Sequence, residues 1–289
     1  GIDWHPGDVV LVATSEEYPS NVYPWQRLAR RGVELRAVPA PGGRLDPAAF
    51  AAAGDARTRL IAVSSVQYAT GVRVDLPALG QLCRDRGWWL CVDGIQSLGV
   101  LPCDVKAAGV HFLAADSHKW MLGLPGIGVL FVDRSVVGAI EPALIGWRST
   151  KTRFDFDRVA LDLRDDALRF EEGNLPYALI EGMGAAIDLL LDARVERIRD
   201  HVFRLNDVLV ERLRRDGHTV TSPTDAARSG SVVFRPKVGD PVAIAEALHR
   251  AGVILSCRRG ALRVSPHLYN TADEVLTVAD RLETAAGGR

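Results

Sequence analysis

Two apolar runs in this sequence are each followed by residue types that could perform chemistry. Residues 88–92 precede an acid, Asp93, and residues 110–115 precede His118 and Lys119. Such runs are typical of buried strands, and parallel-sheet enzymes present catalytic groups where buried strands end. Asp93 and Lys119 are therefore candidates for one active site.

A lysine and a carboxylate together fit the chemistry of pyridoxal phosphate (PLP), which forms a Schiff base with a lysine and faces an acid through its ring nitrogen. Lys119 would bind the cofactor covalently and then move protons. Asp93 would keep the ring nitrogen protonated, so that the ring accepts electrons from a substrate carbanion. Gln96 can reach the ring oxygen, and His118 is placed beside the phosphate.

Each of these residues also has an ordinary explanation. Asp93 could cap the end of a strand, and Lys119 could be a solvated loop residue. Taken singly, either residue is better explained in that way. The combination, with His118 directly before Lys119 and a glycine-rich segment at 123–128 leading into another strand, favours the cofactor site.

The combination resembles the class V aminotransferases of PLP fold type I, the family of cysteine desulfurases, selenocysteine lyases, kynureninases and isopenicillin epimerases. The resemblance runs from Gly7 to Leu282 and implies an α/β fold, with a mainly parallel large-domain sheet flanked by helices and a smaller C-terminal α/β domain. In relatives, an N-terminal arm and a phosphate-binding turn precede the point where this sequence begins, and we expect the chain to lack them. The resemblance also implies a homodimer, in which the segment 169–174 reaches the partner's cofactor phosphate. Asn174 stands where relatives have a threonine.

Composition agrees with a large globular enzyme. The 289 residues, 47% of them hydrophobic, are ample for one large and one smaller domain. We predict a PLP-binding large domain at 1–175, a linking helix region at 176–228 and a small domain at 229–289. The net charge of -1 gives no indication that the chain binds nucleic acid or an anionic membrane surface. No apolar run could span a bilayer, and the N-terminus is not a signal peptide.

The four cysteines show neither metal-ligand spacing nor a disulfide pattern, which predicts reduced thiols in a cytoplasmic protein without a metal site. Hydrophobic patterning predicts the secondary structure. In the large domain we expect strands at 8–14, 33–38, 59–64, 88–92 and 110–115, and helices at 46–53 and 76–86. A long apolar-periodic segment, 177–213, should link the domains. In the small domain we expect strands at 231–235, 253–256 and 262–264, and helices at 242–251 and 271–285.

The resemblance also implies two aromatic contacts with the cofactor. Tyr18 occupies the place of a histidine that stacks on the pyridine ring in cysteine desulfurases, and Tyr68 the place of an asparagine that touches the ring oxygen. A phenol provides the stacking face but is a poorer acid-base group near neutral pH than an imidazole. The simpler alternative is that Tyr18 only packs in its loop.

For the substrate, the resemblance assigns the α-carboxylate of an amino acid to Arg263. A guanidinium fork suits this bidentate contact. Arg258 or Arg259 would supply a second positive group, although both could simply be surface charges.

The expected reaction type depends on a loop cysteine that this sequence lacks at the matching place. Cysteine desulfurases carry a nucleophilic cysteine on a mobile loop, whereas this chain has only a short connection at 260–262, and Cys257 lies on a predicted strand. We therefore expect a lyase that cleaves a carbon-sulfur or carbon-selenium bond by β-elimination, without a persulfide cysteine. Transamination or epimerisation by a class V enzyme is the alternative. A catalytically silent PLP-fold subunit is the alternative from another class.

Overall fold

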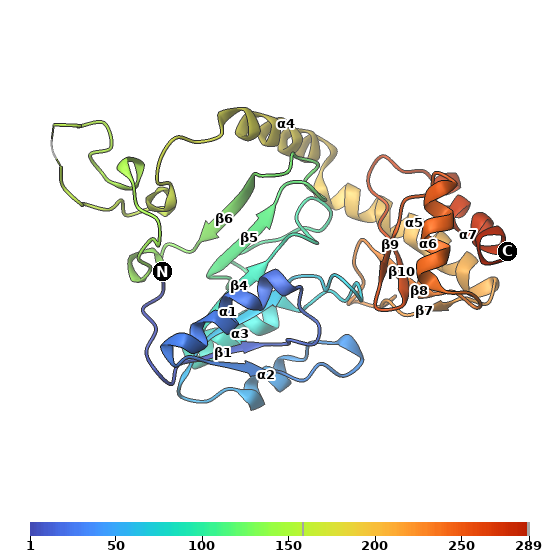
Figure 1. Cartoon of the computed structure of the whole chain (residues 1–289), viewed down its shortest axis with the longest axis horizontal. Helices are drawn as coiled ribbons and strands as arrows, with labels where there is room; N and C mark the ends of the chain where they lie inside the picture. Colours follow the sequence, from blue (N-terminus) through green and yellow to red (C-terminus); the bar gives the residue numbers. More distant parts are fainter. Residues whose placement is uncertain (158, 288–289) are drawn as a thin grey trace.

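The computed structural model describes residues 1–157 and 159–287. A six-stranded sheet forms the larger part of the molecule, in the order β2-β1-β3-β4-β5-β6 (Figure 1). All neighbouring strands in it are parallel except β5 and β6. The strands are β1 (Val9–Val12), β2 (Glu34–Ala37), β3 (Thr58–Ser64), β4 (Trp89–Asp93), β5 (Phe112–Asp116) and β6 (Gly128–Val132). The predicted parallel strands are thus confirmed, with small changes at their ends.

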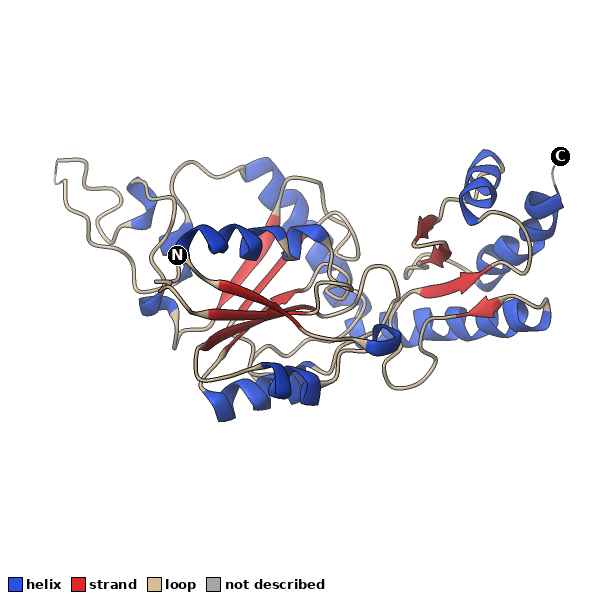
Figure 2. Cartoon of the chain, turned by 60° about the horizontal axis from the view of Figure 1, so that its bottom comes forward, coloured by secondary structure: helices blue, strands red, loops and turns tan. Residues whose placement is uncertain are grey.

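Helices cover both faces of this sheet (Figure 2). Alternate residues of β1 explain the two layers, because Val9 and Leu11 belong to the core under α2 and α3, while Val10 and Val12 pack with residues of the α1 region. The helices of the chain are α1 (Tyr23–Arg27), α2 (Pro47–Ala53), α3 (Leu76–Arg86), α4 (Tyr177–Ala193), α5 (Val195–Arg215), α6 (Pro241–Arg250) and α7 (Ala272–Gly287). Short 3-10 helices are η1 (Pro19–Asn21), η2 (Leu28–Arg31), η3 (Pro41–Gly43), η4 (Val137–Ala139), η5 (Trp147–Ser149) and η6 (Ala167–Phe170).

The predicted linking segment is not one continuous helix. It divides into α4 and α5 at Arg194, whose φ of 64° leaves the helical region. The apolar periodicity continues through this residue, so the break gave no sequence signal. Leu209 and Leu213 of α5 then belong to the core of the C-terminal sheet.

The C-terminal sheet has four antiparallel strands in the order β7-β8-β10-β9. They are β7 (Thr219–Val220), β8 (Val232–Arg235), β9 (Ser256–Arg258) and β10 (Ala261–Val264), and β7 was not predicted. The strand predicted at 253–256 is displaced toward the C-terminus, because Ser256 is the residue that pairs with Arg263. Helices α5, α6 and α7 contribute the apolar residues that cover one face of this sheet.

Helix caps follow the sequence closely. The Asp75 carboxylate accepts a hydrogen bond from Ala78 N at 3.0 Å and begins α3. At α7, Thr271 and Glu274 form a reciprocal capping pair, with bonds of 2.8 and 3.3 Å. The side-chain oxygen of Asn270, just before this pair, accepts a hydrogen bond from His267 N. None of the described helices is both long and apolar enough to cross a membrane.

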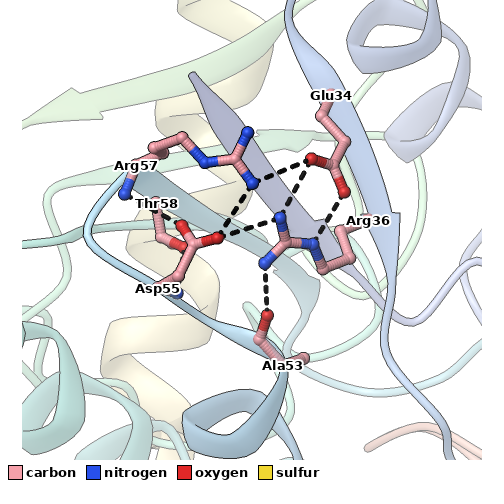
Figure 3. Close-up of polar contacts among 6 residues, drawn as sticks. All are labelled: Glu34, Arg36, Ala53, Asp55, Arg57 and Thr58. Carbon is pink, nitrogen blue, oxygen red and sulfur yellow. Dashed lines mark hydrogen bonds and ion pairs between the residues drawn. The ribbon is translucent and has the colours of Figure 1, made fainter. Parts of the chain in front are cut away.

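An ion-pair network fastens the edge strand β2 to its neighbours (Figure 3). The Arg36 guanidinium donates to Glu34 at 2.7 and 2.9 Å, to Asp55 at 3.2 Å and to the Ala53 carbonyl at 2.6 Å. Arg57 adds a bond to Asp55 at 3.0 Å. Arg36 therefore joins the edge strand to the last residue of α2 and to the turn that follows it.

We expect Arg36→Gln to lower the free energy of unfolding by about 1 kcal/mol, the upper range for a partly exposed ion pair, because several contacts are lost together. Urea unfolding monitored by circular dichroism measures the change. Arg57→Gln is the matched control, and its loss should be smaller because that side chain is 56% exposed. Equal losses in the two variants would contradict a special role for Arg36.

Candidate active site

The two principal site residues meet at one edge of the large sheet. Asp93 is the last residue of β4, where it lies beside Ser64 of β3 and Ala114 of β5. Lys119 follows closely after the end of β5. The parallel arrangement of β3, β4 and β5 thus places both residues at the carboxyl end of the sheet.

Asp93 is a partly buried acid, and its surroundings disfavour the negative charge of its carboxylate. Burial raises its pKa, and the negative charges of Glu17 and Asp116 raise it further. A hydrogen bond from Ile95 N, 2.9 Å long, and the charge of Lys119 act in the opposite direction. The ionised form of this acid would therefore be stabilised by a cation placed against it.

The surroundings of Lys119 disfavour the positive charge of its amine. Burial lowers the pKa of its amine most, and the positive charge of Arg263 is the next cause. Arg258 lowers the pKa as well, whereas Asp93 and Asp116 raise it. Within the described part of the chain, no hydrogen bond or ion pair engages this amine. A lysine with a lowered pKa is more often neutral, which is the form that acts as a nucleophile or base.

Gln96 and His118 are neighbours of these two residues in the chain. Gln96 is buried, and its side-chain oxygen accepts a long hydrogen bond of 3.4 Å from the Trp120 indole, which leaves its amide nitrogen free to donate elsewhere. His118 is exposed and lies 3.7 Å from the Asp116 carboxylate.

Tyr18 and Tyr68 form an aromatic pair beside the site. Their ring centroids are 5.2 Å apart and their planes are almost perpendicular, at 81°. The guanidinium of Arg259 lies 5.6 Å from the centre of the Tyr68 ring. Tyr18 is 48% exposed, so its ring remains accessible to a further stacking partner.

Arg263 brings the C-terminal sheet to the site. It lies on β10 opposite Ser256 and Val233, and its guanidinium donates to the Tyr68 carbonyl. The Nε atom is buried without a hydrogen-bond partner, and burial lowers the pKa of the group. Within the described residues no acid forms an ion pair with it, so this guanidinium is suited to receive an external carboxylate.

The structure separates the two neighbouring arginines. Arg259 forms an ion pair with Glu16 at 3.2 Å and donates to the Ser15 carbonyl. Arg258 is exposed, and within the described residues its guanidinium donates only to the carbonyl of Cys257, at 2.8 Å. Arg259 is therefore committed to a contact with the large domain, and Arg258 is the one with a free charge.

A tight turn joins β9 to β10. Only Arg259 and Gly260 lie between the two strands, and both have the positive φ of the left-handed region, 50° and 71°. Cys257 pairs with Leu262, and both pack with the core under the small-domain helices. The Cys257 thiol thus belongs to the opposite face of the sheet from Arg263, because side chains alternate along a strand.

Sequence analysis missed three residues at the site. Glu16 and Glu17 are buried acids in the loop that bears Tyr18. His267 donates through Nε2 to the Trp120 carbonyl at 2.9 Å, because its Nδ1 accepts from Leu268 N at 2.7 Å. The acids gave no signal, since carboxylates in a polar loop ordinarily point to solvent. A histidine next to a Ser-Pro turn is equally uninformative by its type alone.

A cavity of about 600 Å³ lies away from Lys119. Its walls include the hydroxyl-bearing residues Ser65 and Ser97, together with Arg73 and Asp225. The two serine hydroxyls bond each other at 2.7 Å, and Ser65 also donates to the Asp93 carbonyl. This cavity is therefore lined by serines close to Asp93, but its lining does not include Asp93, Lys119 or Arg263.

Comparison with known proteins indicates the family of this chain. The family model described as Aminotransferase class-V matches residues 2–278. A probable cysteine desulfurase of Methanothermobacter thermautotrophicus is 31% identical, over 99% of this chain and 75% of its own length. A cystine C-S lyase, solved with its reaction product cysteine persulfide, has a TM-score of 0.90 and 26% identity, covering 98% of this chain and 76% of that one. A variant of that lyase, solved with glycine covalently linked to its PLP cofactor, has a TM-score of 0.90, 25% identity and the same coverage.

The chain belongs to the class-V aminotransferase family. It is a PLP-dependent enzyme similar to cysteine desulfurases, and its α/β fold with a mainly parallel central sheet is that of PLP fold type I. These findings confirm the fold class, the family and the cofactor that the sequence predicted. The membership of this family favours an enzyme over the alternative of a catalytically silent subunit.

The residues present fit pyridoxal phosphate. Among the described residues no ion pair engages the Asp93 carboxylate, which suits the partner of a protonated ring nitrogen. Lys119 has an unengaged amine with a lowered pKa, which suits a Schiff-base lysine. The orphaned Nε of Arg263 suits the carboxylate of an amino acid bound to the cofactor. Each of the three groups thus lacks the partner that the cofactor or its substrate would provide.

We expect Arg263→Lys to lower kcat/KM for amino-acid substrates about tenfold or more, the scale of one charge-assisted hydrogen bond. Lysine keeps the charge but loses the planar fork that matches a carboxylate. Steady-state kinetics measure the loss, and Arg259→Lys is the matched control because that guanidinium is held by Glu16. An unchanged kcat/KM in the Arg263 variant would move the carboxylate site to Arg258.

Proposed function

We propose that the chain is a PLP-dependent lyase that cleaves the carbon-sulfur or carbon-selenium bond of a cysteine-type amino acid by β-elimination. The observation that carries the proposal is the two-residue turn between β9 and β10, which leaves no loop on which a sulfur-accepting cysteine could move. Cys257, the nearest thiol in sequence, packs with the core of the small domain. The similarity to a cystine C-S lyase supports the same reaction type.

The proposal assigns a role to each residue of the site. Bound pyridoxal phosphate supplies an electron sink joined to the substrate nitrogen. Arg263 receives the α-carboxylate, Asp93 holds the proton at the ring nitrogen, and Lys119 takes the proton from Cα. Tyr18 stacks on the ring, and His118 binds the phosphate.

Three further contacts complete the proposed site. Gln96 and Tyr68 would contact the ring oxygen of the bound cofactor, and Arg258 would supply additional positive charge on the substrate side. When the bond from Cβ to sulfur breaks, the sulfur leaves with the bonding electrons and takes a proton. Cysteine and one water then yield pyruvate, ammonia and hydrogen sulfide, whereas cystine yields cysteine persulfide as the sulfur product.

Product analysis without a keto-acid acceptor tests the proposal. The enzyme is incubated with L-cysteine, L-cystine or selenocysteine, and catalytic pyruvate supports elimination. One equivalent of a keto acid that retains its side chain would instead indicate transamination. Alanine together with a persulfide on Cys257 would overturn the proposal, and Cys257→Ala should leave pyruvate formation unchanged.

The same proposal includes a homodimer. The segment after η4 exposes large apolar side chains that water does not favour, namely Leu144, Phe154, Phe156 and Leu161, each 67% to 73% exposed. Arg169, at the start of the segment expected to cross the interface, donates to the Val137 carbonyl of its own chain at 2.9 Å. We expect light scattering to give the mass of two chains. A monomer that still binds PLP tightly would contradict this prediction.

We also propose a cytoplasmic setting for this chain. Cys83, Cys91, Cys103 and Cys257 are all free in the structure. Unpaired cysteines are ordinary in reducing compartments and uncommon in oxidising ones.

A further inference from the structure

The Glu17 carboxylate is buried but fully satisfied. It is 3% exposed and accepts four hydrogen bonds from three side chains and one backbone amide. Asn21 donates at 2.9 Å, Gln67 at 2.7 Å, and Ser64 through both its amide and its hydroxyl, at 2.8 and 2.5 Å. A carboxylate with all these donors is held in one orientation.

Each partner of Glu17 is next to a residue of the proposed site. Glu17 itself directly precedes Tyr18, and Asn21 closes the short helix that Tyr18 begins. Gln67 directly precedes Tyr68. Ser64 lies beside Asp93 in the neighbouring strand. The Glu17 carboxylate therefore joins the two loops that bear Tyr18 and Tyr68 to the end of β3, which lies beside Asp93.

We propose that Glu17 is a positioning residue of the cofactor site, which fixes the Tyr18 and Tyr68 rings relative to each other and places a second carboxylate near Asp93. Glu17 does not itself contact the reacting atoms, because its oxygens are occupied by Asn21, Ser64 and Gln67. The proposal rests on the cofactor site and not on the type of reaction. It therefore holds equally for elimination and for transamination.

The charges around Asp93 give the proposal its electrostatic consequence. Glu17 and Asp116 raise the pKa of Asp93, and Lys119 lowers it. The nearby Cys91 thiol contributes no charge, because burial and the negative charges of Asp93 and Glu17 raise its pKa to about 12. A second fixed carboxylate favours retention of a proton or cation at Asp93. In the loaded enzyme, that is the position of the protonated ring nitrogen.

Glu17→Gln tests the charge, because it keeps the size of the side chain. The measurement is the pKa of Asp93 in the cofactor-free protein, from the ¹³C chemical shift of its carboxyl group, assigned by comparison with Asp93→Asn. We expect the pKa to fall, since one of the negative charges that raise it is removed. Glu16→Gln is the matched control, as this neighbouring acid is also buried but pairs with Arg259, and it should leave the titration unchanged.

A second variant tests the positioning separately. Ser64→Ala removes the hydroxyl donor but keeps the Glu17 charge, so the pKa of Asp93 should remain raised. The near-ultraviolet circular dichroism of the coupled tyrosines should weaken in both Ser64→Ala and Glu17→Gln, and the Tyr18→Phe spectrum identifies that signal. An unchanged Asp93 titration in Glu17→Gln would overturn the electrostatic role. Unchanged tyrosine dichroism in Ser64→Ala, which can be measured even if Glu17→Gln does not fold, would overturn the positioning role.

Discussion

Replacement of Lys119 by alanine is expected to abolish covalent attachment of pyridoxal phosphate and to lower turnover about a thousandfold or more. Alanine removes both the amine that binds the cofactor and the base that takes the substrate proton, and general base catalysis alone is worth about 10² to 10⁴. Noncovalent binding should persist, because Asp93, Gln96 and His118 remain. Borohydride reduction followed by intact-mass analysis measures the attachment.

Lys106→Ala is the control for the Lys119 variant, because Lys106 is exposed and lies in a turn closed by Asp104. This variant should retain the mass increase of the reduced cofactor. If reduction still fixed the cofactor to Lys119→Ala protein, another amine would be the Schiff-base residue.

The second large effect is expected for Asp93→Asn, with turnover lowered about a thousandfold and cofactor binding largely kept. An amide cannot hold a proton on the ring nitrogen, and loss of one preorganised electrostatic partner costs about 10² to 10³ in rate. The substitution is nearly isosteric, and the bond from Ile95 N can still be accepted by the amide oxygen. Turnover and cofactor content are measured on the same preparation.

Asp116→Asn separates this role from a general effect of negative charge. Both acids raise the pKa of Lys119, but the Asp116 side chain is 60% exposed and is not at the end of β4. Its replacement should change turnover far less. Near-normal turnover in Asp93→Asn would show that Asp93 is only the end of a strand.

The parts of the site that follow local rules could be predicted from the sequence. Apolar runs of strand length identified β4 and β5, and the acid and lysine after them followed directly. The cap at Asp75 was equally local, since a side chain bonds an amide three residues away. The roles assigned to Asp93 and Lys119 nevertheless stay predictions.

Features that depend on distant partners could not be predicted. Glu17 is explained by Ser64 and Gln67, and Arg259 by Glu16, which lies far from it in the sequence. The start of β9 depends on pairing with β10, which overrode the apolar residues at 253–255. In each case the sequence contains the residue, but only the tertiary fold gives it a partner.

The position of Trp120 should make its intrinsic fluorescence sensitive to cofactor binding. Its indole is 6% exposed, lies next to Lys119 in the chain and packs against His267 at a ring distance of 5.3 Å. Addition of an alanine-sized side chain at Gly230 would bring a carbon within 2.8 Å of the indole, so the ring has little room to move. A rigid indole that is shielded from water emits at short wavelength. A nearby pyridoxal chromophore that absorbs at this wavelength can quench the emission by energy transfer. Titration of the unlabelled protein with the cofactor should therefore dim this tryptophan in proportion to occupancy.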